Sequence, residues 1–334
     1  MVFWTQMPPG FQDTPKPFQW VEFFAGEAQA TEQMKYYGGR TTARLDIVYM
    51  SDKNGVPGTN PMDITSPCGM ATALQTVLRG DHEKGWACHF GLKCASWTSI
   101  NSGTSGRSAC SSIGNLDYQS VLTSNCMASR MILLMMIVVC LNGTIILEQP
   151  FGSFFEHYPR WRDFVMMLLR HGGNGAVHRT TWYMLHYGGP TPKRHVAWAN
   201  SRHIGRLNLG RLIGWAKRKR ELASRGQAPP QLVQKYFDKS GKRRYKGTSK
   251  LRSSENYPPA FGRKMSDLWN QLVSEKSGMP SLPDPIPPAL ETFTSLDMDD
   301  VWTEADMPAV CRYLRGGTSL RIPDSFRDVL PKKI

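Results

Sequence analysis

A cysteine and a carboxylate occupy comparable positions in this chain, each at the end of an apolar run that predicts a buried strand. Cys94 follows the run 85–92, and Glu148 lies near the end of the run 144–150. A thiolate is a nucleophile, and a nearby carboxyl group can protonate the ring nitrogen that receives the displaced electrons. The pair suits covalent catalysis on an electron-poor ring carbon. A small buried apolar residue is the alternative for Cys94, and the polar loop that follows it favours catalysis.

A glycine turn and an aspartate indicate a second function at the same edge. In FFAGEAQA, Gly26 lies where a predicted strand passes into a helix, so that backbone N–H groups and a helix N-terminus can approach a polar ligand. Asp46 follows 20 residues later, at the end of the second predicted strand. A carboxylate there can accept hydrogen bonds from a ribose. A tight turn with a solvated Asp46 is the alternative.

The elements that must position these residues alternate along the chain. We predict strands at 21–24, 43–49, 85–92, 144–150 and 194–200, and helices at 27–37, 67–79, 117–141 and 157–171. This alternation predicts an α/β fold, with a doubly wound sheet of parallel strands and crossover helices on both faces. Ligands of such sheets bind beyond the carboxyl ends of the strands, where Cys94, Glu148 and Asp46 would meet.

Composition narrows the class of protein. A chain of 334 residues with 40% hydrophobic content can bury a large core. The apolar run 131–141 is too short to cross a bilayer, so we predict a core helix and no membrane association. No secretory pattern is visible at the start. Seven cysteines without a CxxC pair indicate free thiols in a reducing compartment, rather than a disulfide framework or a structural zinc site.

Positive charge is concentrated in one segment. Residues 193–264 contain 20 Lys or Arg and three acids, a net charge of +17, whereas the whole chain carries +14. Aromatic residues are interleaved with its densest parts, at 217–220 and 239–246. This pattern is typical of binding to phosphates and stacked bases. A solvated surface or a nuclear import signal is the alternative.

The chain carries a series of motifs in a recognisable order: FFAGEAQA, RLDIVY, MDI, KCASWTS, LEQP, YGGPTPKRHVAWAN and NYPPAFGRKM. The series resembles the motifs of the carbon-5 cytosine methyltransferases, which have a Rossmann-like fold and use S-adenosyl-L-methionine (SAM). In that family the cofactor turn is roughly DLFAGxGG, the nucleophile loop PCQxFS, the acid ENV, a later motif YGVPQxRxR, and the last GNxVPP. The order is kept from residue 21 to about residue 265.

The resemblance implies roles for individual residues. Cys94 would attack carbon 6 of a cytosine and Glu148 would hold the edge of the ring, with Lys93 and Arg194 as further catalytic residues. The residues implied in SAM binding are Phe24, Ala25, Gly26, Glu27, Asp46, Ile47, Asp63, Ile64, Asn256 and Pro258. The residues expected to contact DNA, or RNA as the second choice, are Arg107, Lys217, Arg218, Lys219, Arg220, Lys242, Arg243, Arg244 and Lys246.

Several positions depart from the family pattern. Lys93 replaces the proline before the nucleophile, and its charge is expected to lower the pKa of the thiol. Ala28 and Ala30 stand where the family tends to have glycine, and Gln149 replaces an asparagine. Trp97 and Thr98 replace a Phe and a Ser. In TPKRH, Thr191, Lys193 and His195 take the positions of QxRxR, and Arg194 is out of register.

The expected organisation has five parts. They are an N-terminal extension (1–18), a Rossmann-like catalytic domain (19–200), a basic target-recognition-like region (201–255), a returning helix (256–280), and a Pro-rich linker with an acidic tail (281–334).

The expected function is methyl transfer to carbon 5 of cytosine in DNA, in an intracellular protein that would be nuclear in a eukaryote. Two alternatives remain open. One is a catalytically silent nucleic-acid-binding protein, and the other is a SAM-dependent enzyme with a different acceptor. The serine-rich loop 99–108 is expected to be mobile and to close on the substrate.

Overall fold

The computed structural model describes residues 16–214, 217, 220–221, 224–226, 233–237, 239, 241, 243–247 and 255–274. The chain divides into two compact units, Met1–Gly278 and Met279–Ile334. Every described residue belongs to the first unit. The predicted N-terminal extension up to residue 15, and the predicted linker and tail, therefore lie outside the described residues.

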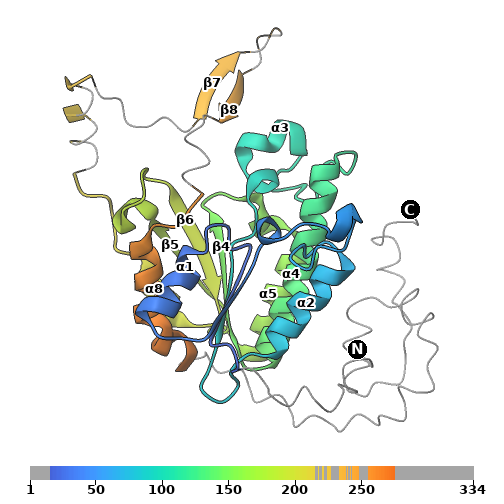
Figure 1. Cartoon of the computed structure of the whole chain (residues 1–334). Helices are drawn as coiled ribbons and strands as arrows, with labels where there is room; N and C mark the ends of the chain where they lie inside the picture. Colours follow the sequence, from blue (N-terminus) through green and yellow to red (C-terminus); the bar gives the residue numbers. More distant parts are fainter. Residues whose placement is uncertain are drawn as a thin grey trace. The chain divides into compact units, whose positions relative to one another are not determined.

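A six-stranded sheet forms the centre of the first unit (Figure 1), in the order β2-β1-β3-β4-β6-β5. The strands are β1 (Trp20–Phe23), β2 (Thr42–Leu45), β3 (Ala87–Phe90), β4 (Thr144–Pro150), β5 (His178–Tyr183) and β6 (Arg194–Ala199). The first four are parallel, whereas β6 is antiparallel to both of its neighbours. The α/β class is confirmed, but the expectation of a wholly parallel sheet is wrong.

The reversal of β6 follows from the short connection that precedes it. Between β5 and β6 the chain makes a 3₁₀ turn, Met184–Tyr187, and then passes through Gly188 and Gly189. A parallel return needs a crossover of a dozen or more residues, usually a helix. The chain therefore turns back antiparallel. The sequence analysis missed β5, because only two of its six residues are buried and its apolar pattern is weak.

Helices cover both faces of the sheet (Figure 1). On one face lie α1 (Gln29–Glu32), which continues as a π-helical turn, Gln33–Tyr37, and α8 (Pro259–Ser274). On the other face lie α2 (Pro67–Leu78), α4 (Gln119–Cys140) and α5 (Pro159–Gly172). Strands β1 and β3 are buried along their whole length, as strands covered on both faces must be. The predicted doubly wound arrangement is present around the parallel part of the sheet.

Helix α4 contains the apolar run that we predicted to be a core helix. By length and composition it is the one helix among the described residues that could cross a membrane. In the fold it contacts β3, β4, α2 and α5, and Met131, Leu134 and Met135 are fully buried. Its apolar composition is therefore used for packing against the sheet.

The second strand is shorter than the predicted 43–49. It ends at Leu45, because the Asp46 carboxylate accepts the Val48 N–H at 3.1 Å and starts a 3₁₀ turn, Ile47–Tyr49. Asp46 is thus a capping residue as well as a strand-end residue.

The turn from β1 into α1 is strained. Phe24, Gly26 and Ala28 have φ values of 58°, 50° and 51°, in the left-handed region that residues with a Cβ seldom adopt. Buried Glu22 holds the end of this turn, since its Oε2 accepts the Thr31 N–H at 2.9 Å and the Thr31 hydroxyl at 2.5 Å. Ala28 therefore adopts a glycine conformation at a position where the resembling family tends to have glycine.

A separate two-stranded antiparallel sheet is formed within the predicted basic region by β7 (Val233–Phe237) and β8 (Arg243–Gly247). Tyr236 and Phe237 are exposed on β7, and Tyr245 is exposed on β8.

Replacing Ala28 and Ala30 by glycine tests the strain. A left-handed conformation costs a residue with a Cβ about 1–2 kcal/mol. Ala28→Gly relieves this strain, which should offset most of the stability lost through higher chain entropy and the missing buried methyl group. Ala30→Gly in the regular helix recovers nothing and should lower the free energy of unfolding by about 1–2 kcal/mol. Chemical denaturation of both variants measures the difference. Equal losses would show that Ala28 is not strained.

Candidate active site

A cavity of about 1100 Å³ lies at the carboxyl ends of β1, β2, β3 and β4. Its lining includes three of the predicted catalytic residues, Cys94, Glu148 and Lys93. The predicted cofactor residues that line it are Phe24, Ala25, Gly26, Glu27, Asp46, Ile47, Asp63, Ile64 and Asn256. One cavity therefore collects residues from positions 24 to 256 of the chain.

Cys94 lies between β3 and a 3₁₀ turn, Ala95–Trp97, and is partly exposed. Its carbonyl accepts the Trp97 N–H at 2.8 Å, which fixes the backbone at Cys94. Burial raises the pKa of the Cys94 thiol, and the positive charge of Lys193 opposes this rise. The expectation that Lys93 would lower this pKa is wrong: Lys93 lines the cavity, but the opposing charge comes from Lys193.

Glu148 is buried and both of its carboxylate oxygens accept hydrogen bonds. His195 Nδ1 lies 2.5 Å from Oε1, and the Tyr257 hydroxyl donates to Oε2 at 2.7 Å. Burial raises the pKa of this carboxyl, but the charge of His195 and the hydrogen bonds from His195 and Tyr257 outweigh it and lower the pKa to about 2. Glu148 is therefore ionised. The expectation of a carboxyl group that carries its own proton is wrong for the free protein.

Gln149, which replaces the asparagine of the family motif, ties two strand ends together. Its side-chain amide donates to the Leu92 carbonyl at 2.6 Å, and its oxygen accepts the Ser153 hydroxyl at 3.0 Å. Leu92 is two residues before Cys94. The bond therefore fixes the start of the loop that carries Cys94 relative to Glu148.

The other half of the cavity is built on Asp46 and Asp63. The Asp46 carboxylate accepts the N–H groups of Gly26 at 2.9 Å and Val48 at 3.1 Å. Asp63 Oδ1 accepts the N–H and the hydroxyl of Thr65. A carboxylate has about four acceptor sites, so both retain sites for a ligand.

The segment 255–257 closes the cavity from the far end of the chain. Glu255, Asn256 and Tyr257 line it, whereas Pro258 does not. The Pro258 carbonyl instead accepts the Phe261 N–H at the start of α8. Gly91 allows this closure, since a Cβ at residue 91 would come within 3.1 Å of the Tyr257 hydroxyl. Sequence analysis missed Tyr257, although it is the residue between two predicted site residues.

Arg107 does not contact solvent, so the expectation that it binds a phosphate is wrong. Its guanidinium lies 3.5 Å from the centre of the Trp97 ring and is only 1% exposed. It donates to the Ser96 hydroxyl, the Asn125 side chain and the carbonyls of Ser112 and Ile113. Burial lowers its pKa to about 10. Arg107 thus fastens the serine-rich loop to α4, and the expectation of a mobile loop is not supported.

Arg194 points away from the cavity, so its assignment as a catalytic residue is wrong. Side chains alternate along β6, and those of Lys193 and His195 line the cavity instead. Arg194 is exposed, donates to the Thr181 hydroxyl at 2.8 Å and lies over the Phe151 ring. The register of TPKRH against QxRxR could have identified this. Trp97 is fully buried, and neither it nor Thr98 lines the cavity.

Two of the predicted nucleic-acid-binding residues, Lys217 and Arg220, are exposed. Arg243, Arg244 and Lys246 belong to β8, but their side chains are outside the described part of the chain. Arg218, Lys219 and Lys242 lie outside the described residues.

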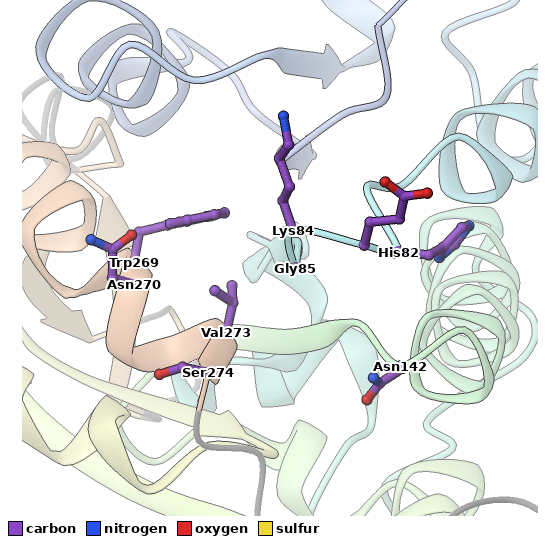
Figure 2. Close-up of a pocket in the computed structure, with 9 residues that line it drawn as sticks. His82, Lys84, Gly85, Asn142, Trp269, Asn270, Val273 and Ser274 are labelled. Atoms are coloured by element: carbon purple, nitrogen blue, oxygen red, sulfur yellow. The ribbon is translucent and has the colours of Figure 1, made fainter.

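A second cavity, of about 410 Å³, lies at the opposite edge of the sheet (Figure 2), near the amino ends of β3 and β4. Lys84, Asn142, Asn270 and Ser274 are among its lining residues. The described cysteines are all free thiols, and none lines this second cavity.

The fold and the cavity thus define an α/β protein with a thiol, an ionised carboxylate and a histidine at the carboxyl edge of its sheet. No protein-family model matches the chain, and none of the curated proteins compared with it matches its sequence.

The structural role of Arg107 gives a direct test. Arg107→Gln should lower the free energy of unfolding by about 2–3 kcal/mol, because several buried acceptors lose a charged donor, and should leave the salt dependence of DNA binding unchanged. Arg160→Gln, at an exposed position of α5, is the matched control and should be close to neutral. Chemical denaturation and salt titrations measure these effects. A flatter salt dependence in Arg107→Gln would show that Arg107 contacts a phosphate after all.

Proposed function

We propose that this protein transfers a methyl group from SAM to carbon 5 of cytosine in DNA, through a covalent adduct at Cys94. The observation that carries the proposal is the single cavity at the carboxyl edge of the sheet, which is lined by Cys94, Glu148 and Asp46. The positions of these residues at strand ends in the sequence predict that they meet at this edge. Their presence in one cavity supports both the resemblance and the reaction.

The side chains that line the cavity can bind the chemical groups of SAM. Asp46 has acceptor sites for the ribose hydroxyls, and the aliphatic side chains of Ile47 and Ile64 offer an apolar surface for adenine. SAM supplies the methyl group when bound.

Charge distinguishes SAM from phosphate-bearing cofactors. Five carboxylate side chains line the cavity, from Glu27, Asp46, Asp63, Glu148 and Glu255, against the lysines Lys93 and Lys193. An excess of carboxylates attracts the positively charged sulfonium of SAM and repels the pyrophosphate of a dinucleotide.

The same charges constrain how DNA is bound. A phosphate backbone cannot enter a cavity lined by five carboxylates at low cost, whereas a neutral base can. The target cytosine therefore has to leave the stack to reach Cys94. The backbone remains outside the cavity, and basic residues of the 193–264 segment other than Lys193 neutralise its phosphates.

In the adduct, the Cys94 sulfur bonds to carbon 6 of the ring. The electron pair of the C5–C6 double bond moves to C4–C5, and the pair of C4–N3 moves to nitrogen 3, which takes up a proton. Carbon 5 then becomes nucleophilic. Glu148 contacts the nitrogen 3 edge, and Lys193 favours the thiolate form of Cys94.

A Cys94→Ser variant separates an enzyme from a silent DNA-binding protein. Calorimetry should show SAM binding within about twofold of the wild type, because the cofactor residues are intact. Methyl transfer to DNA, and covalent trapping on DNA containing 5-fluorocytosine, should be lost. Methyl transfer that persists in Cys94→Ser would contradict the proposal. Absence of SAM binding and of transfer in the wild type would favour the silent protein.

Neutralising the KRRYK stretch, residues 242–246, tests the DNA surface. Four basic residues are removed when Lys242, Arg243, Arg244 and Lys246 become glutamine. The slope of log affinity against log salt should fall by up to roughly 3.6, because each lost phosphate contact removes about 0.9. SAM binding should not change. An unaltered salt slope would show that DNA is bound elsewhere.

A further inference from the structure

Glu148 has no proton of its own to give to a base. Its pKa is lowered to about 2, and both oxygens already accept hydrogen bonds. Nitrogen 3 of the base must nevertheless gain a proton when the thiolate adds to carbon 6. Another group has to supply it. A donor that acts through Glu148 must lie within hydrogen-bond distance of that carboxylate.

In the described part of the chain, the hydrogen bonds recorded to the Glu148 carboxylate come from Tyr257 and His195. Tyr257 is a very weak donor, since burial and the adjacent Glu148 charge raise the pKa of its hydroxyl far above the usual value. His195 Nδ1 lies 2.5 Å from Glu148 Oε1. An imidazolium is the stronger acid by several powers of ten.

The ring of His195 is buried and is bonded on one side only. The residue is 3% exposed, and its Nε2 atom has no hydrogen-bond partner among the described residues. A buried charged donor without a partner is costly. The Trp182 ring, which stacks on His195 at 5.7 Å, does not accept that proton. Among the described residues, the hydrogen bond from Nδ1 to Glu148 is therefore the contact through which this ring can pass on a proton.

We propose that His195 supplies the proton for nitrogen 3 of the cytosine, passing it from Nδ1 through the Glu148 carboxylate. This inference rests on the proposed function, because it requires a cytosine in the cavity. His195 acts through Glu148 and need not touch the base. An arginine, which the resembling family has at this position, holds its protons too tightly for this role.

Every proton and every bond in this step is accounted for. Before addition, Cys94 is a thiolate, His195 an imidazolium and Glu148 a carboxylate. After addition, the sulfur is bonded to carbon 6, nitrogen 3 carries the proton, His195 is neutral, and Glu148 is again a carboxylate. Carbon 5 can then take a deuteron from D₂O and lose its own hydrogen to solvent. Reversal expels the thiolate and returns the nitrogen 3 proton to His195.

Other charged groups set the pH range of this step. Glu148 on β4, Glu255, and Lys193 directly before β6 line the same cavity as His195. Cys94, after β3, has to be deprotonated, and its pKa is raised by burial. The rate should therefore rise with pH as the thiolate forms and fall again as the imidazolium is lost.

Exchange of the carbon 5 hydrogen in D₂O, with a cytosine-containing DNA and without SAM, tests the inference. Mass spectrometry follows deuterium uptake between about pH 5 and 9, which spans the range in which imidazoles titrate. The wild-type rate should fall about tenfold per pH unit on the alkaline side. His195→Arg keeps a positive charge beside Glu148 but releases no proton, so exchange should be roughly 100-fold slower and the alkaline fall should disappear. Methyl transfer is measured over the same pH series.

Tyr257→Phe is the matched control. It removes the other hydrogen bond to the same carboxylate and leaves the imidazole in place, so the reaction should slow but keep its alkaline fall. DNA affinity and thermal unfolding show that each variant is folded.

The outcomes separate the two proposals. If His195→Arg retains the wild-type rate and the wild-type alkaline fall, His195 only orients Glu148, and the inference is overturned while the proposed function stands. If the wild type catalyses neither exchange nor methyl transfer at any pH, the proposed function itself fails.

Discussion

The buried carboxylate of Glu148 is the point on which the architecture of the site depends. It lies on β4 and accepts hydrogen bonds from His195 on β6 and from Tyr257 before α8. Three separate parts of the chain are thereby held at one place. Removal of either donor would leave a buried charge incompletely satisfied, which is far more costly than loss of a surface ion pair. The two hydrogen bonds to Glu148 therefore both hold the cavity together and keep this carboxyl group ionised.

The sequence could predict which residues meet, because strand ends are visible in it. Buried strands are continuous apolar runs, and the carboxyl ends of parallel strands share one edge, so Cys94, Asp46 and Glu148 could be assigned together. The orientation of β6 depends on the length of a connection without a helix, and that signal was not used. Arg107 was misjudged because its partners include backbone carbonyls and the Trp97 ring, which charge and spacing do not reveal. Tyr257 was missed because its partner is 109 residues away.

Negative and positive charge are concentrated in different parts of this protein. The cavity has an excess of carboxylates, whereas the segment from Lys193 to Lys264 carries a net charge of +17. A phosphate backbone is attracted to the second and repelled by the first. An uncharged ring is neither attracted nor repelled by these charges and can enter the cavity. In the proposed reaction, this distribution of charge selects which part of the DNA reaches the thiol.

The long separation between Glu148 and Tyr257 also bears on biosynthesis. Helix α8 supplies Phe261, Met265, Leu268 and Leu272 to the core on one face of the sheet, so the packing of that face around α1 is incomplete until the chain has been made past residue 272. A ribosome-bound chain that ends before Tyr257 has Cys94 and the turn at Gly26 but no closed cavity. The cavity is therefore completed late, after nearly all of the fold's sequence has been translated.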